Sequence, residues 1–157
     1  MKVGFIGVGS IGNPMAKQLL NSGFDVMVND INQNAADTLI RSGATWANNP
    51  ADLAKQCQFI CTCLPGPSQM EEVLIGQKGI INTIKNKSIY IDHTTNSLES
   101  IKKVNRFLAE KNIDMLDAPV SGGVEGAQTR DLTLLVGGKS HVVAKSMPVW
   151  MQLGKQY

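Results

Sequence analysis

The chain has 157 residues, of which 43% are apolar and 18% are charged, and its formal net charge is +2. This length suits one domain around a single hydrophobic core, and the weakly basic balance with scattered lysines predicts no nucleic-acid partner. No apolar run approaches the roughly 18 residues of a membrane-spanning helix, so no membrane partner is expected. A predicted strand begins at the second residue, and we therefore expect no cleavable targeting segment.

The first half of the chain alternates short apolar runs with amphipathic stretches, which is typical of strands that are followed by helices. The apolar runs predict strands at 2–8, 25–30 and 59–65. The stretches between and after them predict helices at 11–23, 32–43, 51–56 and 67–76.

The second half continues the same rhythm. We expect strands at 88–94, 113–119 and 132–138, and helices at 98–112 and 141–154. Strands that alternate with helices form right-handed crossovers and a mostly parallel sheet. The prediction is one α/β domain over residues 1–157 with a doubly wound, mostly parallel sheet.

Three cysteines lie close together at Cys57, Cys61 and Cys63. Their spacing makes no CxxC pair, and an odd count does not suit a disulfide scaffold. We interpret them as buried thiols on or beside a strand, which favours a reducing, cytoplasmic compartment. No metal site is expected.

A glycine array follows the first strand. Gly7, Gly9 and Gly12 form a GxGxxG motif between a predicted strand and a predicted helix, the context in which this motif binds a dinucleotide. Gly7 allows the tight turn, Gly9 lets a pyrophosphate approach the backbone, and Gly12 lets helix and strand pack closely. Ser10 and Ile11, between these glycines, belong to the same phosphate loop, where the first helical amides hold the phosphates. The sheet is therefore expected to be of the Rossmann type.

Asp30 ends the second predicted strand, 23 positions after Gly7 (30 − 7). A carboxylate there can accept hydrogen bonds from the adenosine ribose and would repel a 2′-phosphate, and no arginine follows it in "NDINQN". The preferred cofactor is NAD rather than NADP. The alternative role for Asp30 is a helix N-cap or a solvated turn residue.

Several blocks of the chain resemble the β-hydroxyacid dehydrogenase family, which includes 3-hydroxyisobutyrate dehydrogenase, tartronate semialdehyde reductase and, more distantly, 6-phosphogluconate dehydrogenase. The resemblance rests on "GFIGVGSIGNPMAKQLL" (4–20), "CLPGPSQMEEVL" (63–74), "IDHTT" (91–95), "DAPVSGG" (117–123) and "LTLLVGG" (132–138). These blocks stand in the family's order and span nearly the whole chain. "DAPVSGG" after a strand is the most specific of them.

The resemblance implies roles for individual residues. The backbone of Leu64 and Pro65 would line the adenosine and the nicotinamide ribose, and the Thr95 hydroxyl would lie near the nicotinamide carboxamide. Ser121, Gly122 and Gly123 would grip the substrate carboxylate. A serine hydroxyl beside consecutive backbone amides suits an anion, and glycine lets the anion approach without a Cβ clash. The alternative for this segment is a plain glycine turn.

Three features depart from the family pattern. "HTTNSL" lacks the proline that usually follows the Asp-Ser-Thr block, and Arg130 stands where glycine is common. The family's general acid/base is a lysine of a separate all-helical domain, and this chain stops at "WMQLGKQY", before that domain would begin. We therefore assign no catalytic residue here. His93, next to the cofactor loop, is interpreted as a hydrogen-bonded loop histidine.

The resemblance implies reversible hydride transfer between a nicotinamide and a small β-hydroxy acid or its semialdehyde. On this interpretation the chain is the cofactor domain of a longer two-domain protein, which would form a homo-oligomer through the helical domain. The apolar cluster in "MPVWMQLG" is then expected to be covered by that domain. Two alternatives stay open: a stand-alone dinucleotide-binding or interaction module, and the cofactor domain of an imine reductase.

Overall fold

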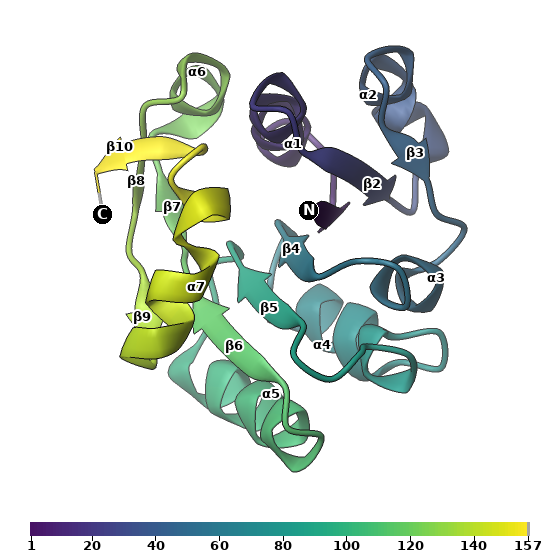
Figure 1. The fold of residues 1–157 in the computed structure, drawn as a ribbon, viewed down its shortest axis with the longest axis vertical. Helices are drawn as coiled ribbons and strands as arrows, with labels where there is room; N and C mark the ends of the chain where they lie inside the picture. Colours follow the sequence, from purple (N-terminus) through teal and green to yellow (C-terminus); the bar gives the residue numbers. More distant parts are fainter. Residues whose placement is uncertain (157) are drawn as a thin grey trace.

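The computed structural model describes residues 1–156, which form a twisted sheet with helices on both faces (Figure 1). The strands are β1 (Lys2–Ile6), β2 (Asp25–Asn29), β3 (Thr45–Trp46), β4 (Phe59–Thr62), β5 (Ile89–Asp92), β6 (Asp114–Asp117), β7 (Val120–Ser121), β8 (Leu132–Leu134), β9 (Gly137–Gly138) and β10 (Gly154–Gln156). The α-helices are α1 (Gly12–Asn21), α2 (Asp37–Arg41), α3 (Pro50–Ala54), α4 (Pro67–Ile75), α5 (Leu98–Glu110), α6 (Gly123–Thr129) and α7 (Ser140–Trp150). Two 3₁₀ turns complete the set, η1 (Gln33–Ala36) and η2 (Ile80–Asn82).

The main sheet has the order β3-β2-β1-β4-β5-β6-β9. All its pairings are parallel except the last, in which β9 runs antiparallel to β6. The strand order reverses between β1 and β4, where Ile6 lies opposite Thr62. This is the doubly wound arrangement predicted from the sequence, and its switch point is where such sheets bind ligands.

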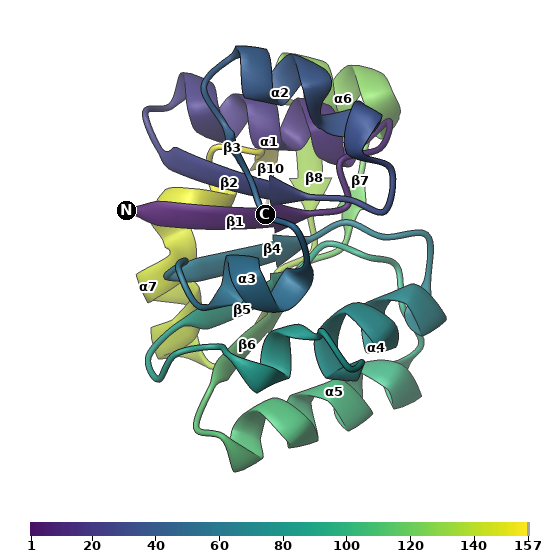
Figure 2. The same cartoon turned by 90° about the vertical axis from the view of Figure 1, so that its right-hand side faces the viewer.

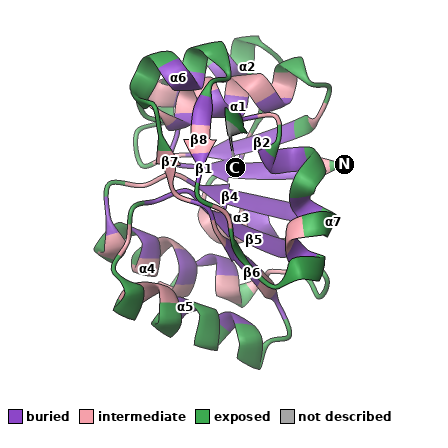
Figure 3. Cartoon of the chain, turned by 90° about the vertical axis from the view of Figure 1, so that its left-hand side faces the viewer, coloured by how far each residue is buried: buried purple, intermediate pink, exposed green. Residues whose placement is uncertain are grey.

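Two apolar cores lie on the two faces of this sheet. One is formed with α1, α2, α6 and α7, and the other with α3, α4 and α5. Figure 2 shows α1, α2 and α6 on one side of the strands and α4 and α5 on the other. The central strands are buried on both faces (Figure 3), which explains their nearly continuous apolar sequences.

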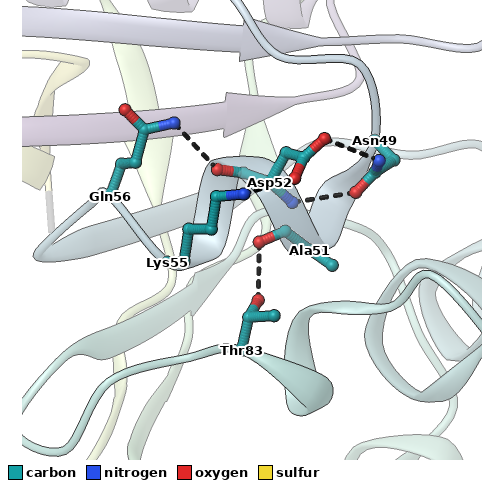
Figure 4. A network of polar contacts seen from close by, with 6 residues as sticks. All are labelled: Asn49, Ala51, Asp52, Lys55, Gln56 and Thr83. Carbon is teal, nitrogen blue, oxygen red and sulfur yellow. Dashed lines mark hydrogen bonds and ion pairs between the residues drawn. The ribbon is translucent and has the colours of Figure 1, made fainter.

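Among the described α-helices, α3 and α5 begin at a side-chain cap. The Ser97 side chain accepts a hydrogen bond from the backbone amide of Ser100 at the start of α5, and Ile101, Val104 and Leu108 then recur at helical spacing on its packed face. Asn49 caps α3 in the same way, and Figure 4 shows the polar network around it. Among the described helices none is long and apolar enough to cross a membrane.

The last third of the chain differs from its prediction. Residues 132–138 are not one strand: β8 pairs with β7 and β10 in a separate three-stranded sheet, whereas β9 joins the main sheet. The amide of Leu135, between the two, donates to Pro119 O at 3.0 Å. The predicted helix at 141–154 stops at Trp150, and Gly154 pairs with Leu132 in β10, so closely that any Cβ would clash with the Leu132 carbonyl.

The apolar cluster at the C-terminal end is also corrected. Val149, Trp150 and Leu153 are buried in the core beside α1 and β8 of this same domain. Met147 and Met151 stay partly exposed. The three buried residues therefore serve this domain's own packing, and for them the expectation of cover by another domain was wrong. For the exposed Met147 and Met151 that expectation stays a prediction.

Candidate functional site

A cavity of about 1130 Å³ opens at the carboxyl ends of β1, β2 and β4. Its wall includes eight of the nine predicted cofactor residues, all except Thr95: Gly7, Gly9, Ser10, Ile11, Gly12, Asp30, Leu64 and Pro65. The sequence reasoning missed other lining residues, among them Ile31, Trp46, Asn48, Asn49, Gln69 and Lys78. Trp46 ends β3, Gln69 lies in α4, and the other four lie on loops outside the glycine motif. No local pattern marks these residues; the signal that could have found most of them is that they end or follow strands at one edge of the sheet.

The glycine loop leaves a gap where a phosphate group would fit. Gly7 has a φ of 87°, and a Cβ there would press on the Cys63 carbonyl. A Cβ at Gly12 would clash with the Gly7 carbonyl, so this glycine brings α1 against β1. At Gly9, by contrast, a Cβ would meet no protein atom within 4 Å. Gly7 and Gly12 are thus needed by the fold, whereas Gly9 faces open space in the cavity.

The N-terminus of α1 at Gly12 directly follows this loop; the Asn13 amide donates to Gly9 O at 2.9 Å, and Pro14 has no N–H. Ile11 is the N-cap residue and makes no side-chain cap hydrogen bond, and the first turn holds no acidic residue. The first amides of a helix lack partners inside the helix, and they attract anions together with the helix dipole. The residues present therefore fit a pyrophosphate.

Asp30 stands directly after β2 at the mouth of the cavity. Its Oδ2 accepts a hydrogen bond from the Val8 amide and its Oδ1 one from the Asn32 amide, both at 2.8 Å. The cap of η1 is Asn32, which accepts from Asn34, so Asp30 is not a helix N-cap. The two amides hold the Asp30 carboxylate beside the glycine loop. The remaining lone pairs of the carboxylate could accept hydrogen bonds from ribose hydroxyls there.

The loops that follow β4 and β5 are joined at the next part of the sheet edge. The Leu64 amide donates to the Thr94 hydroxyl at 3.1 Å, and the Thr94 amide donates to Asp92 Oδ1 at 3.0 Å. Leu64 lines the cavity, but Thr95 is exposed and does not. The predicted contact between Thr95 and the nicotinamide stays a prediction.

The predicted substrate segment lies apart from the cavity. Ser121 ends β7 and pairs with Thr133 of β8, and α6 begins two residues later. Gly122 and Gly123 have φ values of 133° and 65°, in the region that favours glycine. All three predicted residues are exposed, and none lines the cavity. The segment is an open glycine-rich turn, and its role toward a substrate stays a prediction.

His93 is an interior residue. Its Nδ1 lies 2.8 Å from Ala118 O, and its ring stacks with that of Phe5 at a centroid distance of 6.3 Å. Burial lowers the pKa of His93 to about 4, against the opposing effect of the Ala118 carbonyl. The ring is therefore neutral at pH 7 and is not an imidazolium acid; its Nδ1–H donates to Ala118 O, which confirms the interpretation of a hydrogen-bonded histidine.

The three thiols are free, as predicted. Cys57 and Cys61 are buried, and Cys63 is half-buried at the edge of the cavity. Burial raises the pKa of Cys57 to about 12 and that of Cys63 to about 11. Thiols that stay protonated at neutral pH are poor nucleophiles, so these residues act as packing groups. Within residues 1–156 no three metal-binding side chains gather.

Comparisons with known proteins agree with this geometry. Residues 2–157 match the family model described as the NAD binding domain of 6-phosphogluconate dehydrogenase. An uncharacterized oxidoreductase of Bacillus subtilis is 38% identical over 153 residues, 98% of this chain and 53% of that protein. The 3-hydroxyisobutyrate dehydrogenase of Pseudomonas aeruginosa is 33% identical over 98% of this chain and 51% of its own length.

A solved structure of 3-hydroxyisobutyrate dehydrogenase from Salmonella typhimurium superposes with a TM-score of 0.93 at 26% identity, over 99% of this chain and 54% of that one. The chain thus spans about half the length of the curated relatives that it matches. The match to the family model runs from β1 to the end of the chain and includes the glycine loop, Asp30 and the "DAPVSGG" turn. The chain therefore belongs to the family of NAD-binding domains of 6-phosphogluconate dehydrogenase, which its 3-hydroxyisobutyrate dehydrogenase-like relatives share.

Proposed function

We propose that this chain is the cofactor domain of an NAD-dependent dehydrogenase that acts on a small β-hydroxy acid or its semialdehyde. The observation that carries the proposal is the cavity at the switch point of the sheet, where an uncapped helix N-terminus meets the fixed carboxylate of Asp30. The bound cofactor would supply the hydride chemistry, and the protein binds and orients it.

The preference for NAD rests on Asp30. Its two oxygens accept from the Val8 and Asn32 amides, which fix a negative charge at the position that we propose for the adenosine ribose. Ribose hydroxyls can donate to this carboxylate, whereas a 2′-phosphate would meet repulsion. Calorimetric titration with NADH and NADPH tests this: NADH should bind more tightly, and Asp30→Ala should reduce the difference. Equal binding of both by the unaltered chain would contradict the preference.

The substrate half of the proposal rests on Ser121–Gly123. The Ser121 residue is exposed, and a Cβ at Gly123 would meet no protein atom within 4 Å, which leaves room for a carboxylate beside the serine hydroxyl. No group of this domain is proposed as the general acid/base, because His93 is neutral and buried and the expected lysine belongs to a second domain. We propose that such a domain supplies the proton donor and the contacts of a homo-oligomer.

A direct experiment is to assay hydride transfer in this chain and in a protein that joins it to a helical domain of a family member. The joined protein should oxidise a β-hydroxy acid with NAD, and this chain alone should not. An isolated chain with full turnover would show that the proton donor lies within residues 1–157.

A joined protein that reduces imines but no semialdehyde would favour the imine reductase alternative. NADH binding without turnover in both would favour the binding-module alternative. We propose a cytoplasmic setting, which the absence of a disulfide among the three described cysteines supports.

A further inference from the structure

A buried carboxylate stands behind the cavity, next to the residues already described. Asp92 ends β5 and is 0% exposed. Its Oδ1 accepts hydrogen bonds from the Thr62 hydroxyl at 2.7 Å and from the Thr94 amide at 3.0 Å, and its Oδ2 accepts one from the Asn96 side chain at 2.6 Å. Three donors from two different segments thus converge on one side chain.

These donors come from the end of β4 and from the loop that follows β5. Thr62 is the last residue of β4, and Thr94 and Asn96 lie in the loop after β5. β4 and β5 are neighbours in register, with Thr62 opposite Asp92, and both point their carboxyl ends to the same edge (Figure 2). Tyr90 OH lies 2.8 Å from the Thr62 hydroxyl and completes the buried chain. Since Thr62 donates to Asp92, the Tyr90 hydroxyl donates to Thr62.

The chain of contacts continues to the wall of the cavity. The Thr94 hydroxyl accepts the Leu64 amide at 3.1 Å, so the loop after β5 holds the loop after β4. Leu64 lines the cavity and Thr94 itself is 1% exposed. Removal of the Asp92 carboxylate would leave buried donors without acceptors and would release Thr94, and with it Leu64.

In a doubly wound sheet the two halves of a dinucleotide lie on opposite sides of the switch point. The glycine loop and Asp30 belong to the β1–β2 side, and Leu64 and Thr94 belong to the β4–β5 side. We propose that Asp92 is a positioning residue for the nicotinamide half of the cofactor, which acts through Thr94 on the backbone of Leu64. This inference rests on the proposed function.

The experiment compares two ligands in the 157-residue chain. NADH carries both nucleosides, whereas ADP carries the adenosine and the diphosphate without the second nucleoside. Thr94→Val removes the acceptor for the Leu64 amide and keeps the side-chain shape. We expect it to weaken NADH binding about tenfold, as the loss of one partly buried hydrogen bond does, and to leave ADP binding within about twofold. Asp92→Asn should show the same selectivity.

The two substitutions should also be non-additive. Because Asp92 acts through Thr94, the double variant should bind NADH about as weakly as the weaker single variant. Additive losses would overturn the proposed link, as would equal losses for NADH and ADP or no loss for either. If Asp92→Asn does not fold, Thr94→Val alone keeps the comparison between the ligands.

Asp52→Asn is the matched control. Asp52 also anchors a polar network (Figure 4), in which its Oδ2 accepts from Asn49, a residue of the cavity wall on the β2–β3 side. Any loss in this variant should therefore affect NADH and ADP equally. A nicotinamide-selective loss in Asp52→Asn would overturn the assignment of the two halves. An unaltered chain that binds neither ligand would instead refute the proposed function.

Discussion

At the scale of single residues, the glycines of the phosphate loop have different roles: two of them are required by the fold, and one leaves space for a ligand. The sequence presents Gly7, Gly9 and Gly12 as one motif, but a side chain would meet different surroundings at each. Gly7 and Gly12 touch backbone carbonyls of the protein, whereas Gly9 faces the cavity. Substitutions at these positions should therefore fail for different reasons.

Gly9→Ala should lower cofactor affinity without lowering stability. No protein atom lies within 4 Å of the added Cβ, so the free energy of unfolding in urea should change by less than about 0.5 kcal/mol. The methyl group occupies the space in which a pyrophosphate would approach the backbone, and NADH binding should weaken by about tenfold or more. Calorimetric titration measures the affinity.

Gly12→Ala is the matched comparison. Its Cβ would clash with the Gly7 carbonyl, and overpacking of this kind costs about 1–3 kcal/mol. This variant should unfold at lower urea concentration. If Gly9→Ala were the less stable of the two and bound NADH normally, the assignment of the open space to the pyrophosphate would be wrong.

His93 makes stability depend on pH. Its folded pKa of about 4 lies below the ordinary value of 6.5. Between these values the unfolded chain binds a proton that the folded chain does not, so the free energy of unfolding falls as the pH falls from 6.5 to 4. The full contribution, present above pH 6.5, is on the order of 3 kcal/mol. Urea unfolding at a series of pH values should show this fall in the unaltered chain and lose it in His93→Gln.

The effect of His93 is the difference in the free energy of unfolding between the unaltered chain and His93→Gln at each pH. Burial raises the pKa of Asp92 and of Asp117, and raised carboxyl values act in the opposite direction in acid. Both proteins share these carboxyls, so their effect cancels in the difference. The surface substitution His141→Gln should leave the decrease in the free energy of unfolding between pH 6.5 and 4 unchanged. Parallel profiles for the unaltered chain and His93→Gln would show that His93 does not hold its pKa near 4.

Ser121 is predicted to serve the substrate and not the cofactor. It lies in the exposed turn between β7 and α6, outside the cavity wall. Ser121→Ala should therefore leave the NADH dissociation constant in calorimetry within about twofold of the unaltered value. A large loss of NADH affinity would place Ser121 in the cofactor site instead. In the protein joined to a helical domain, the same change should raise KM for the acid.

At the scale of elements, the central strands of the main sheet could be predicted from the sequence because they are buried on both faces, whereas the two-residue edge strand β3 was not predicted. Apolar runs such as "GFI" and "FIC" between helical stretches have one physical explanation, a parallel sheet covered by helices. The glycine motif and Asp30 could be found for the same reason, since their spacing follows from one strand-helix-strand unit. The rest of the cavity wall could not, because Trp46 and Lys78 meet through tertiary packing alone.

The small sheet β7-β8-β10 shows the limit more clearly. The sequence pattern predicts one strand that includes both Leu132–Leu134 and Gly137–Gly138. In the structure the first pairs with β7 and β10 and the second with β6, and these partners are separate segments of the chain. β7 and β10 have two and three residues, too few to show an alternating pattern. Only the pairing with β8 defines them, and pairing partners are not visible in a single sequence.

The cap of α3 connects an element to the site. The Asn49 Oδ1 accepts the Asp52 amide at 2.8 Å, and Asn49 also lines the cavity. Asn49→Ala should lower the free energy of unfolding by about 1 kcal/mol, as the loss of an N-cap does, and should weaken NADH and ADP binding alike. Asn48→Ala is the control, because Asn48 lines the same wall and is not the cap of α3. Urea unfolding that gives equal losses in both variants would contradict the role of the cap.

At the scale of the whole molecule, the cavity sits between the two halves of one continuous sheet. β1 is hydrogen-bonded to β2 on one side and to β4 on the other, so a ligand across the switch point contacts segments from both halves. Unfolding of either half would destroy the cavity. Ligand binding should therefore stabilise the domain as one cooperative unit and not one half alone.

Thermal unfolding with cofactor tests this coupling. NADH at a hundred times its dissociation constant should add about 2.7 kcal/mol to the free energy of unfolding, which for a chain of this size raises Tm by roughly 5–10 °C in a single transition. NADPH at the same concentration should raise it less, because Asp30 opposes the 2′-phosphate. Gly9→Ala should lose the shift while it keeps the Tm of the free protein. Two separate transitions, of which NADH moves one, would show that the halves on either side of β1 and β4 unfold independently.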